Sequence, residues 1–257
     1  MSRPLVVVRA ALRGAWLIGL TLALYLVWTI GHLIASAVAP RLRAPWRRRV
    51  FRVWGRGVCF GLGVRLSVVG EPPRDGVFLV SNHLSYLDIP LLASQMPAVF
   101  VSKSEVADWP LIGRCARAMG TIFLVRARKR ELPDVNRQIE SALAAGDGVV
   151  VFPEGTSTKG DQVLPFRPSL LAPAAEAELP VRAATLRYET KPTDTPASLS
   201  VCWWGDMPFG PHVAELLRLD SIDAQLEFHP EPLADRDRKR LAEKLWGAVN
   251  SRFRPIP

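Results

Sequence analysis

The chain has 257 residues, of which 49% are hydrophobic and 22% are charged. This composition excludes a collagen, a disordered tail and a small disulfide-stabilised protein, and the length suffices for one α/β domain with an appendage. The net charge of +9 is concentrated before Glu71, where eleven arginines and no acidic residue occur. The rest of the chain carries 22 basic and 24 acidic side chains, so a nucleic-acid groove in the main domain is not expected.

The first element is a long apolar segment. Residues 14–39 carry no formal charge over 26 positions, and about 20 apolar residues suffice to cross a bilayer core. Arginines flank both ends, so residues 1–64 are predicted to be a helical membrane anchor. A spanning helix and a helix lying in the interface are both open, and a buried core helix is the alternative. A second helix over 50–64 would lie along the lipid headgroups.

The location of the arginines predicts the orientation of this anchor. The flank after the apolar segment is more basic than the flank before it, which favours keeping the following domain in the cytoplasm. The apolar run is too long for a cleaved signal peptide, and the stretch that follows is rich in arginine. We therefore expect the chain at the cytoplasmic face of the inner membrane.

The remaining residues, 65–257, are predicted to form one α/β domain. Apolar, β-branched runs predict strands at Val77–Ser81, Val99–Ser102, Thr121–Val125, Val149–Phe152, Val181–Tyr188, Leu199–Trp204 and Ile222–Phe228. Apolar stripes predict helices at Pro110–Met119, Leu132–Ala145, Pro211–Leu219 and Asp235–Phe253, with Gly146 as a C-cap. The alternation of strands and helices predicts a mixed, largely parallel sheet covered by helices.

The first cluster of chemical groups, residues 81–88, follows the expected strand at 77–81. His83 and Asp88 resemble a base and the carboxylate that orients it. The simpler interpretation is that Asp88 caps a helix and His83 faces solvent. Ser85 in the same motif is not expected to be a hydrolase nucleophile, because the sequence has no G-x-S-x-G elbow.

Two further clusters follow in the chain. Residues 120–126 end a strand at Arg126, whose guanidinium could hold a phosphate in bidentate fashion; a solvated basic run at a strand exit is the alternative. Residues 152–156 present Glu154 and Thr156 at the end of a buried strand, and Gly155 permits a tight turn and close approach of a ligand. An ordinary strand-to-loop turn is the alternative there.

Together, the three clusters resemble the motifs of the glycerophospholipid acyltransferase family, which includes the 1-acyl-sn-glycerol-3-phosphate acyltransferases. The motif NHxxxxD stands at 82–88, the G-x-I-F-x-x-R block at 120–126, FPEGT at 152–156 and a proline-containing strand at 179–181. Three positions depart from the family pattern. Ser157 replaces an arginine, Val125 replaces Asp or Asn, and Ala183 replaces a second proline. The segments around 152–171 and 203–212 resemble the lyso-ornithine lipid acyltransferase branch.

The resemblance implies a reaction and assigns roles in it. His83 would take the proton of a lysolipid hydroxyl, which would attack acyl-CoA or acyl carrier protein, and Asp88 would orient His83. Arg126, Glu154, Gly155 and Thr156 would bind the acceptor. The resemblance favours 1-acyl-sn-glycerol-3-phosphate as acceptor, giving phosphatidic acid, with lyso-ornithine lipid or another lysolipid as the alternative.

No metal or other cofactor is expected, because no set of His, Cys and carboxylate side chains has the spacing of metal ligands. The three cysteines are far apart and include no CxxC pair, so neither a disulfide framework nor a zinc site is predicted. Membrane lipids, the lysolipid and the acyl donor are the expected partners, and nucleic acid is not. A lipid-binding protein without catalysis is the alternative from another class.

Overall fold

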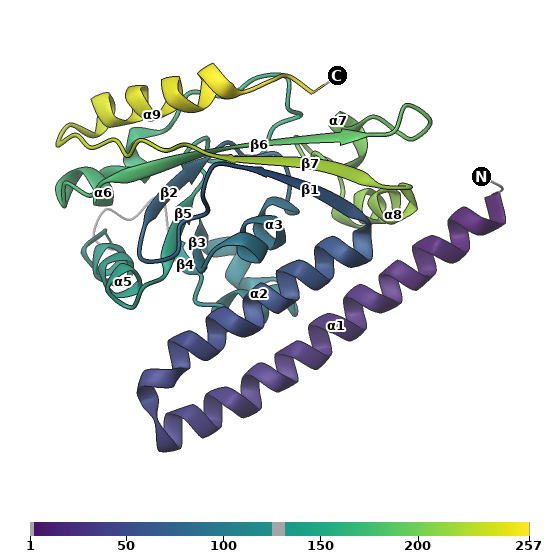
Figure 1. Ribbon diagram of the computed structural model, residues 1–257, viewed down its shortest axis with the longest axis horizontal. Coiled ribbons are helices and arrows are strands. Elements are labelled where there is room, and N and C mark those ends of the chain that lie inside the picture. The colour runs from purple at the N-terminus through teal and green to yellow at the C-terminus, as the bar shows by residue number, and fades with distance from the viewer. Residues whose placement is uncertain (1–2, 125–131, 257) are drawn as a thin grey trace.

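The computed structural model describes residues 3–124 and 132–256 (Figure 1). Val125 and Arg126, and with them the end of the predicted strand at 121–125, lie outside the described residues. The described strands form one sheet in the order β1-β7-β6-β2-β5-β3-β4. All neighbouring pairs are parallel except β6 and β7, which confirms the predicted mixed, largely parallel sheet with helices around it.

The strands are β1 (Val64–Val69), β2 (Phe78–Ser81), β3 (Ala98–Lys103), β4 (Ile122–Leu124), β5 (Gly148–Val151), β6 (Val181–Thr190) and β7 (Ile222–Phe228). The helices are α1 (Arg3–Val38), α2 (Arg43–Leu62), α3 (Asp88–Gln95), α4 (Ile112–Ala118), α5 (Leu132–Ala144), α6 (Ala172–Glu176), α7 (Ala197–Ser200), α8 (Phe209–Arg218) and α9 (Arg238–Arg252). Short 3-10 turns are η1 (Pro40–Leu42), η2 (Ser104–Asp108) and η4 (Pro168–Leu170).

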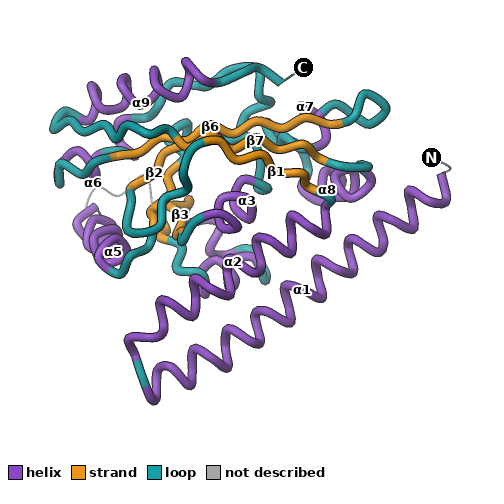
Figure 2. The backbone as a smooth tube through the Cα atoms, in the orientation of Figure 1, coloured by secondary structure: helices purple, strands orange, loops and turns teal. Residues whose placement is uncertain are grey.

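The central strands β2 and β5 are buried on both faces. One face of the sheet packs on α2 and α3, and the other packs on α5, α6 and α9 (Figures 1 and 2). Leu79 and Val150 belong to the first apolar cluster, while Phe78 and Val149 belong to the second. Alternation of side chains along each strand explains this division. A continuous apolar run, as in Gly148–Val151, is the pattern expected of a doubly covered parallel strand.

The register of the central strands creates the edge at which the motifs meet. Val80 of β2 lies beside Val151 of β5 on one side and beside Ala183 of β6 on the other. Because β2 and β5 are parallel, the segments that follow them leave the sheet at the same edge. The NHxxxxD motif follows β2 and the PEGT motif follows β5, so the fold brings two motifs that lie 70 residues apart into contact.

Helices α1 and α2 form an antiparallel hairpin beside the domain (Figure 1). Helix α2 lies between α1 and α3 and buries Phe51, Val58 and Leu62 in the core of the domain. Gly55 permits the close approach of α3, because a Cβ there would lie 2.5 Å from the carbonyl oxygen of Pro90. The predicted helix at 50–64 is therefore part of a longer helix, and its inner face packs on protein.

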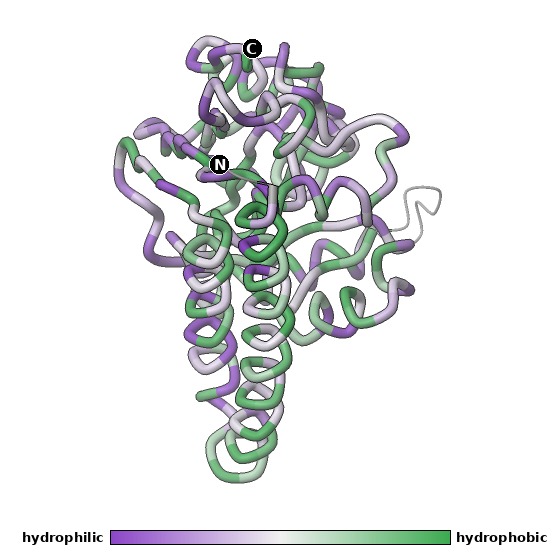
Figure 3. The backbone as a smooth tube through the Cα atoms, turned by 90° about the vertical axis from the view of Figure 1, so that its right-hand side faces the viewer, coloured by the Kyte–Doolittle hydropathy of each residue, from purple (hydrophilic) through white to green (hydrophobic). Residues whose placement is uncertain are grey.

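The described part of α1 is the one candidate membrane span, over Pro4–Val38. No part of its most apolar window is buried, and Figure 3 shows the hairpin of α1 and α2 projecting from the rest of the molecule, with hydrophobic residues along much of its length. At its beginning, Arg9 pairs with Asp220 at 2.7 Å, and Arg13 donates to the carbonyl oxygen of Leu219. These bonds fix the beginning of α1 to the end of α8.

Four further elements differ from the sequence predictions. Strand β1 was not predicted. It begins directly after Gly63, whose φ of 70° ends α2 and turns the chain into the strand. Helices α6 and α7 were also not predicted. The predicted strand Leu199–Trp204 is wrong: α7 ends at Ser200, whose hydroxyl donates to the carbonyl oxygen of Pro196 at 2.9 Å. The apolar run there reflects burial beside the core and does not pair in a sheet.

The other predicted helices are present with shorter or shifted bounds. Gly146 has φ of 83° and donates its backbone N–H to the carbonyl oxygen of Leu143 at 2.9 Å, which confirms it as the C-cap of α5. Helix α9 begins after Asp237, whose side chain accepts hydrogen bonds from the N–H groups of Lys239 and Arg240. The predicted division at residue 64 falls between α2 and β1, although α2 shares the core of the domain.

Candidate active site

His83 and Asp88 lie against each other in the turn from β2 into α3. His83 Nδ1 is 2.7 Å from Asp88 Oδ2, and the same oxygen accepts backbone N–H bonds from Leu84 at 2.8 Å and Ser85 at 3.1 Å. Asp88 is fully buried, whereas the His83 side chain is 22% exposed. A carboxylate at Nδ1 holds the hydrogen on that nitrogen, so Nε2 is left as the basic atom.

Asp88 is held from a second direction by strand β6. The hydroxyl of Tyr188 donates to Asp88 Oδ1 at 2.8 Å. Although α3 begins at Asp88, its N-cap position is Leu87, and no side chain caps the helix there. The Asp88 carboxylate therefore serves the motif loop and His83. The interpretation of Asp88 as a simple helix cap does not fit these contacts.

The buried Glu154 supports the backbone on which His83 stands. Its Oε1 accepts the N–H of His83 at 2.7 Å, and its Oε2 accepts the N–H of Leu164 at 2.7 Å. The residue is 1% exposed, and burial raises the pKa of Glu154 to about 7. The ring of Phe152 stacks on the ring of His83 with 4.1 Å between their centroids. Glu154 thus has the contacts of a positioning residue.

The PEGT loop makes a tight turn over the histidine. Gly155 has φ of 72°, a conformation that residues with a Cβ adopt only with strain. Thr158 donates its N–H to the carbonyl oxygen of His83 at 3.0 Å. Thr156 lies exposed at the tip of the loop. The structure therefore brings Glu154 and Gly155 to the His83–Asp88 pair, with Thr156 at its rim, while Arg126 lies outside the described residues.

Ser157 is used inside the protein. Its hydroxyl donates to the carbonyl oxygen of Trp203, and the N–H of Trp203 donates to the carbonyl oxygen of Leu84 at 2.9 Å. The loop after the PEGT motif, the segment after α7 and the NHxxxxD loop are thereby joined. The residue that departs from the family pattern at position 157 is a structural link between these three segments.

Two residues of the site were missed by sequence reasoning. Asn82, the first residue of NHxxxxD, exchanges two hydrogen bonds with the backbone of Leu186, at 2.8 and 2.9 Å. Tyr188 follows Leu186 by two residues in β6. Because side chains alternate along a strand, Leu186 and Tyr188 share the face toward α3, and this alternation was the signal that could have identified Tyr188.

An aromatic cluster borders the motif loop on the side of α8. The hydroxyl of Tyr86 lies 3.0 Å from His212 Nδ1, and His212 Nε2 donates to the carbonyl oxygen of Cys202 at 3.0 Å. Burial lowers the pKa of His212, so the ring is neutral and its Nδ1 accepts from Tyr86. The ring of Tyr86 also lies 5.2 Å from the ring of Phe209, which lies 6.2 Å from that of Trp109.

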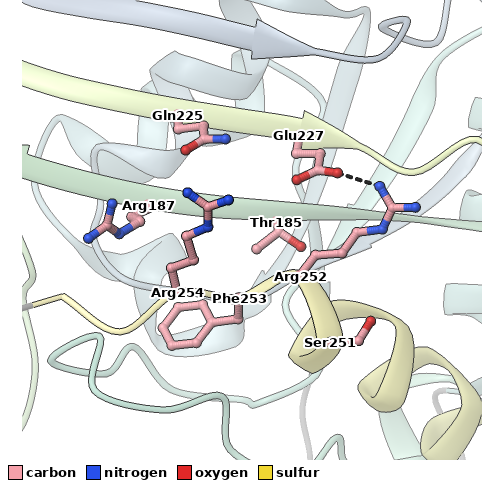
Figure 4. A pocket seen from close by; sticks show the side chains of 8 residues that line it. All are labelled: Thr185, Arg187, Gln225, Glu227, Ser251, Arg252, Phe253 and Arg254. Carbon is pink, nitrogen blue, oxygen red and sulfur yellow. Dashed lines mark hydrogen bonds and ion pairs between the residues drawn. The ribbon is translucent and has the colours of Figure 1, made fainter.

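Two cavities lie near this edge of the sheet. One of about 450 Å³ lies between η2 and α4 and is lined by Trp109, Arg114 and Arg117 among others. The other, of about 290 Å³, lies between the β6–β7 pair and the end of α9 (Figure 4). In it, Arg252 forms an ion pair with Glu227. Neither cavity is lined by a residue of the three motifs.

Comparison with known proteins agrees with this geometry. A family model described as Acyltransferase matches residues 66–187. The lyso-ornithine lipid O-acyltransferase of Rhodobacter capsulatus is 37% identical over 254 residues, covering 95% of this chain and 89% of that protein. The 1-acyl-sn-glycerol-3-phosphate acyltransferase of Neisseria meningitidis is 34% identical over 167 residues, covering 62% of this chain and 66% of that protein.

The fold also matches a solved structure. The crystal structure of the 1-acyl-sn-glycerophosphate acyltransferase PlsC from Thermotoga maritima aligns with a TM-score of 0.59 at 23% identity, covering 93% of this chain and 97% of that one. At this identity the match concerns the fold alone. The sequence relatives align over most of their own length. They show that the chain belongs to the acyltransferase family of enzymes.

Proposed function

We propose that the protein transfers a fatty acyl group from an acyl thioester to the hydroxyl of a lysolipid. The observation that carries this proposal is the His83–Asp88 pair, in which Nε2 of a partly exposed histidine is left free to act as a base. Nε2 takes the hydroxyl proton as the oxygen attacks the thioester carbonyl carbon. The tetrahedral intermediate then expels the thiolate, which receives the proton from His83. The new bond is an ester, and no acyl-enzyme is formed.

Lyso-ornithine lipid is the acceptor we propose. The relatives that match over 82–95% of this chain are named lyso-ornithine lipid O-acyltransferases, whereas the glycerol-phosphate enzymes match over 62%. The hydrogen bond of the Ser157 hydroxyl also supports lyso-ornithine lipid as the acceptor. An arginine at this position could pair with a phosphate, whereas the serine hydroxyl is used on the carbonyl oxygen of Trp203. 1-Acyl-sn-glycerol-3-phosphate is the second candidate, supported by the relatives from Neisseria.

The test is an acyl-transfer assay on membranes that contain the full chain, as wild type and as His83→Ala. Lyso-ornithine lipid and 1-acyl-sn-glycerol-3-phosphate are offered separately, each with labelled acyl-CoA or labelled acyl carrier protein. We expect transfer to lyso-ornithine lipid from at least one donor, reduced about 10²- to 10⁴-fold in the variant. A folded wild type that transfers to neither acceptor, or a His83→Ala variant with full activity, would overturn the proposal.

We further propose that α1 lies within one leaflet at the cytoplasmic face of the inner membrane. Helix α1 is antiparallel to α2, and the turn between them is followed by Arg43, Arg47 and Arg48. A spanning α1 would carry this arginine-rich turn across the hydrocarbon, which is costly for each charge. Its other end is fixed to the domain through Arg9. Exposed apolar side chains along α1 support contact with lipid.

Labelling of single cysteines tests this arrangement. Leu5→Cys and Val38→Cys place thiols near the two ends of α1, in a background with Cys115→Ser. A membrane-impermeant maleimide should label neither position in intact cells and both after the cells are opened and the membrane is dissolved in detergent. Labelling of one end from outside would show that α1 spans the membrane.

A further inference from the structure

The cavity between η2 and α4 has the chemistry of a binding site for a zwitterion. It measures about 450 Å³ and is lined by a carboxylate, Asp108, by two guanidinium groups, Arg114 and Arg117, and by the indole of Trp109. Pockets for small ligands have volumes of about 300–1,000 Å³ and contain a few convergent polar groups. Both signs of charge line the same hollow.

The charged groups of the cavity are available to a ligand. Within residues 3–124 and 132–256, neither Asp108 nor Arg114 forms an ion pair or side-chain hydrogen bond. The guanidinium of Arg117 lies 5.9 Å from the ring centroid of Phe123 and forms no ion pair in this part of the chain. Trp109 is 37% exposed. An arriving ligand therefore displaces no internal ion pair among these residues.

The cavity is lined by η2 and α4, which follow β3 at the edge of the sheet where the NHxxxxD loop follows β2. Strand β3 lies next to β5, which lies next to β2, and neighbouring strands are about 4.8 Å apart. The end of β3, from which η2 starts, is therefore about 10 Å from the end of β2. The rings of Trp109, Phe209 and Tyr86 form a continuous series from the cavity to the NHxxxxD loop.

We infer that this cavity binds the headgroup of the acceptor, and that the headgroup is an amino acid with a free ammonium and a free carboxylate. This inference rests on the proposed function. Asp108 accepts the ammonium, the face of the Trp109 indole favours the same cation, and Arg114 and Arg117 pair with the carboxylate. The hydroxyl of the acceptor lies a few bonds from its headgroup, so this assignment requires that the hydroxyl lie at His83 while the headgroup occupies the cavity.

The presence of Asp108 makes the site selective against phosphate. A phosphate monoester carries about −1.5 to −2 charges at neutral pH. It would gain from the two arginines, but it has no cation for Asp108 and is repelled by that carboxylate. Ornithine carries a side-chain ammonium and a carboxylate, and thus satisfies all three charged groups. The cavity accounts for a preference for lyso-ornithine lipid over a glycerol phosphate acceptor.

The experiment compares wild type with Asp108→Asn on three acceptors: lyso-ornithine lipid, its N-acetylated analogue and 1-acyl-sn-glycerol-3-phosphate. Loss of a charge-assisted bond is expected to lower kcat/KM about tenfold. The wild type should show this loss on the N-acetylated analogue. The Asp108→Asn variant should show it on lyso-ornithine lipid itself. The two changes together should cost little more than either alone, and activity on the glycerol phosphate acceptor should not fall.

The carboxylate side is tested in the same way. Arg114→Gln and Arg117→Gln should lower kcat/KM for lyso-ornithine lipid, and the analogue with an amidated carboxyl should be insensitive to both substitutions. Glu140→Gln is the matched control, because Glu140 is an exposed carboxylate on α5 outside the cavity. This control should match the wild type on all acceptors.

The outcomes separate the inference from the proposed function. Equal losses in Asp108→Asn on all three acceptors, or none on any, would overturn the headgroup assignment while His83-dependent transfer persisted. A wild type that acylates only the glycerol phosphate acceptor would also overturn it. Absence of transfer by the wild type, or transfer that survives His83→Ala, would instead contradict the proposed function itself.

Discussion

Tyr188 donates a hydrogen bond of 2.8 Å to the carboxylate of Asp88, 100 residues earlier in the chain. The group that orients His83 is therefore itself oriented by strand β6. Asp88 Oδ2 is occupied by His83 and two backbone N–H groups, and Oδ1 by Tyr188. This network fixes the ring of His83 before any substrate binds, which lowers the reorganisation needed for proton transfer.

Replacement of Asp88 by asparagine should disable the base while preserving its shape. The amide no longer favours a hydrogen on His83 Nδ1, so Nε2 loses its role as acceptor, and kcat should fall about 10²- to 10⁴-fold. Tyr188→Phe is the matched variant, since it removes only the bond to Oδ1. It should cost about 1–2 kcal/mol of stability and much less activity. Assays of kcat and of thermal unfolding on both variants test this difference between them. Similar kcat values for Asp88→Asn and Tyr188→Phe would contradict the role given to Asp88.

Glu154 should make stability depend on pH. Its pKa of about 7 in the folded protein lies above the ordinary value of 4.5, so the folded state binds this proton more tightly than the unfolded state. The free energy of unfolding should therefore fall as pH rises from about 4.5 to 7, by at most a few kcal/mol, and then level off. Glu154→Gln should lack this component. Denaturant unfolding in micelles measures both proteins, and parallel pH curves would refute the assignment.

Gly155→Ala should destabilise the turn of the PEGT loop over His83. At φ of 72° an added Cβ is strained, at a cost of about 1–2 kcal/mol. Gly247→Ala provides the control, since Gly247 lies in helix α9 with open space around its Cβ position. That variant should gain about 0.5–1 kcal/mol. The two should shift the unfolding midpoint in opposite directions; a stabilised Gly155→Ala would contradict the role of this turn.

Arg47 should be essential to the attachment of α2. Its guanidinium donates to the carboxylate of Asp147 and, at 2.9 Å, to the carbonyl oxygen of Met119. Asp147 is 2% exposed, and Arg47→Ala leaves its buried carboxylate with the more distant guanidinium of Arg48, at 3.8 Å, so the substitution should cost up to about 3–5 kcal/mol.

The ion pair of Arg65 and Asp223 provides the comparison for this effect. Both side chains are about half exposed, and water screens their attraction, so Arg65→Ala should lower the free energy of unfolding far less than Arg47→Ala does. Thermal unfolding of the two variants in the same detergent measures the difference. Equal losses would show that burial of the Arg47 pair contributes nothing.

Residues close together in the sequence supplied most of what could be predicted. His83 and Asp88 lie within one turn, and the FPEGT motif comes directly at the end of one strand. Both motifs can therefore be identified from the sequence without knowledge of the fold. Tyr188 and Asn82 act through contacts about 100 residues away. Their roles depend on the order of strands in the sheet, which local patterns do not encode.

The errors have equally local causes. The run at 199–204 is apolar because Val201 and Cys202 are fully buried, and an apolar run of six residues does not by itself distinguish a strand from a buried turn. Strand β1 is an edge strand whose side chains are mostly exposed. The charged cavity at η2 escaped notice because Asp108 and Arg117 are nine residues apart and meet only when α4 folds back.

The attachment of α1 has a practical consequence for anyone who wishes to handle this enzyme without detergent. Helix α1 covers Leu217 of α8 and the outer side of α2, including Gly57, beside which Leu20 packs. A fragment starting after residue 38 would expose both surfaces and would remove Arg9 from Asp220, which would keep its ion pair with Lys191. Solubilisation is better sought by replacing the outward apolar side chains of α1 with polar ones, because the inner surface of that helix is part of the enzyme's own packing.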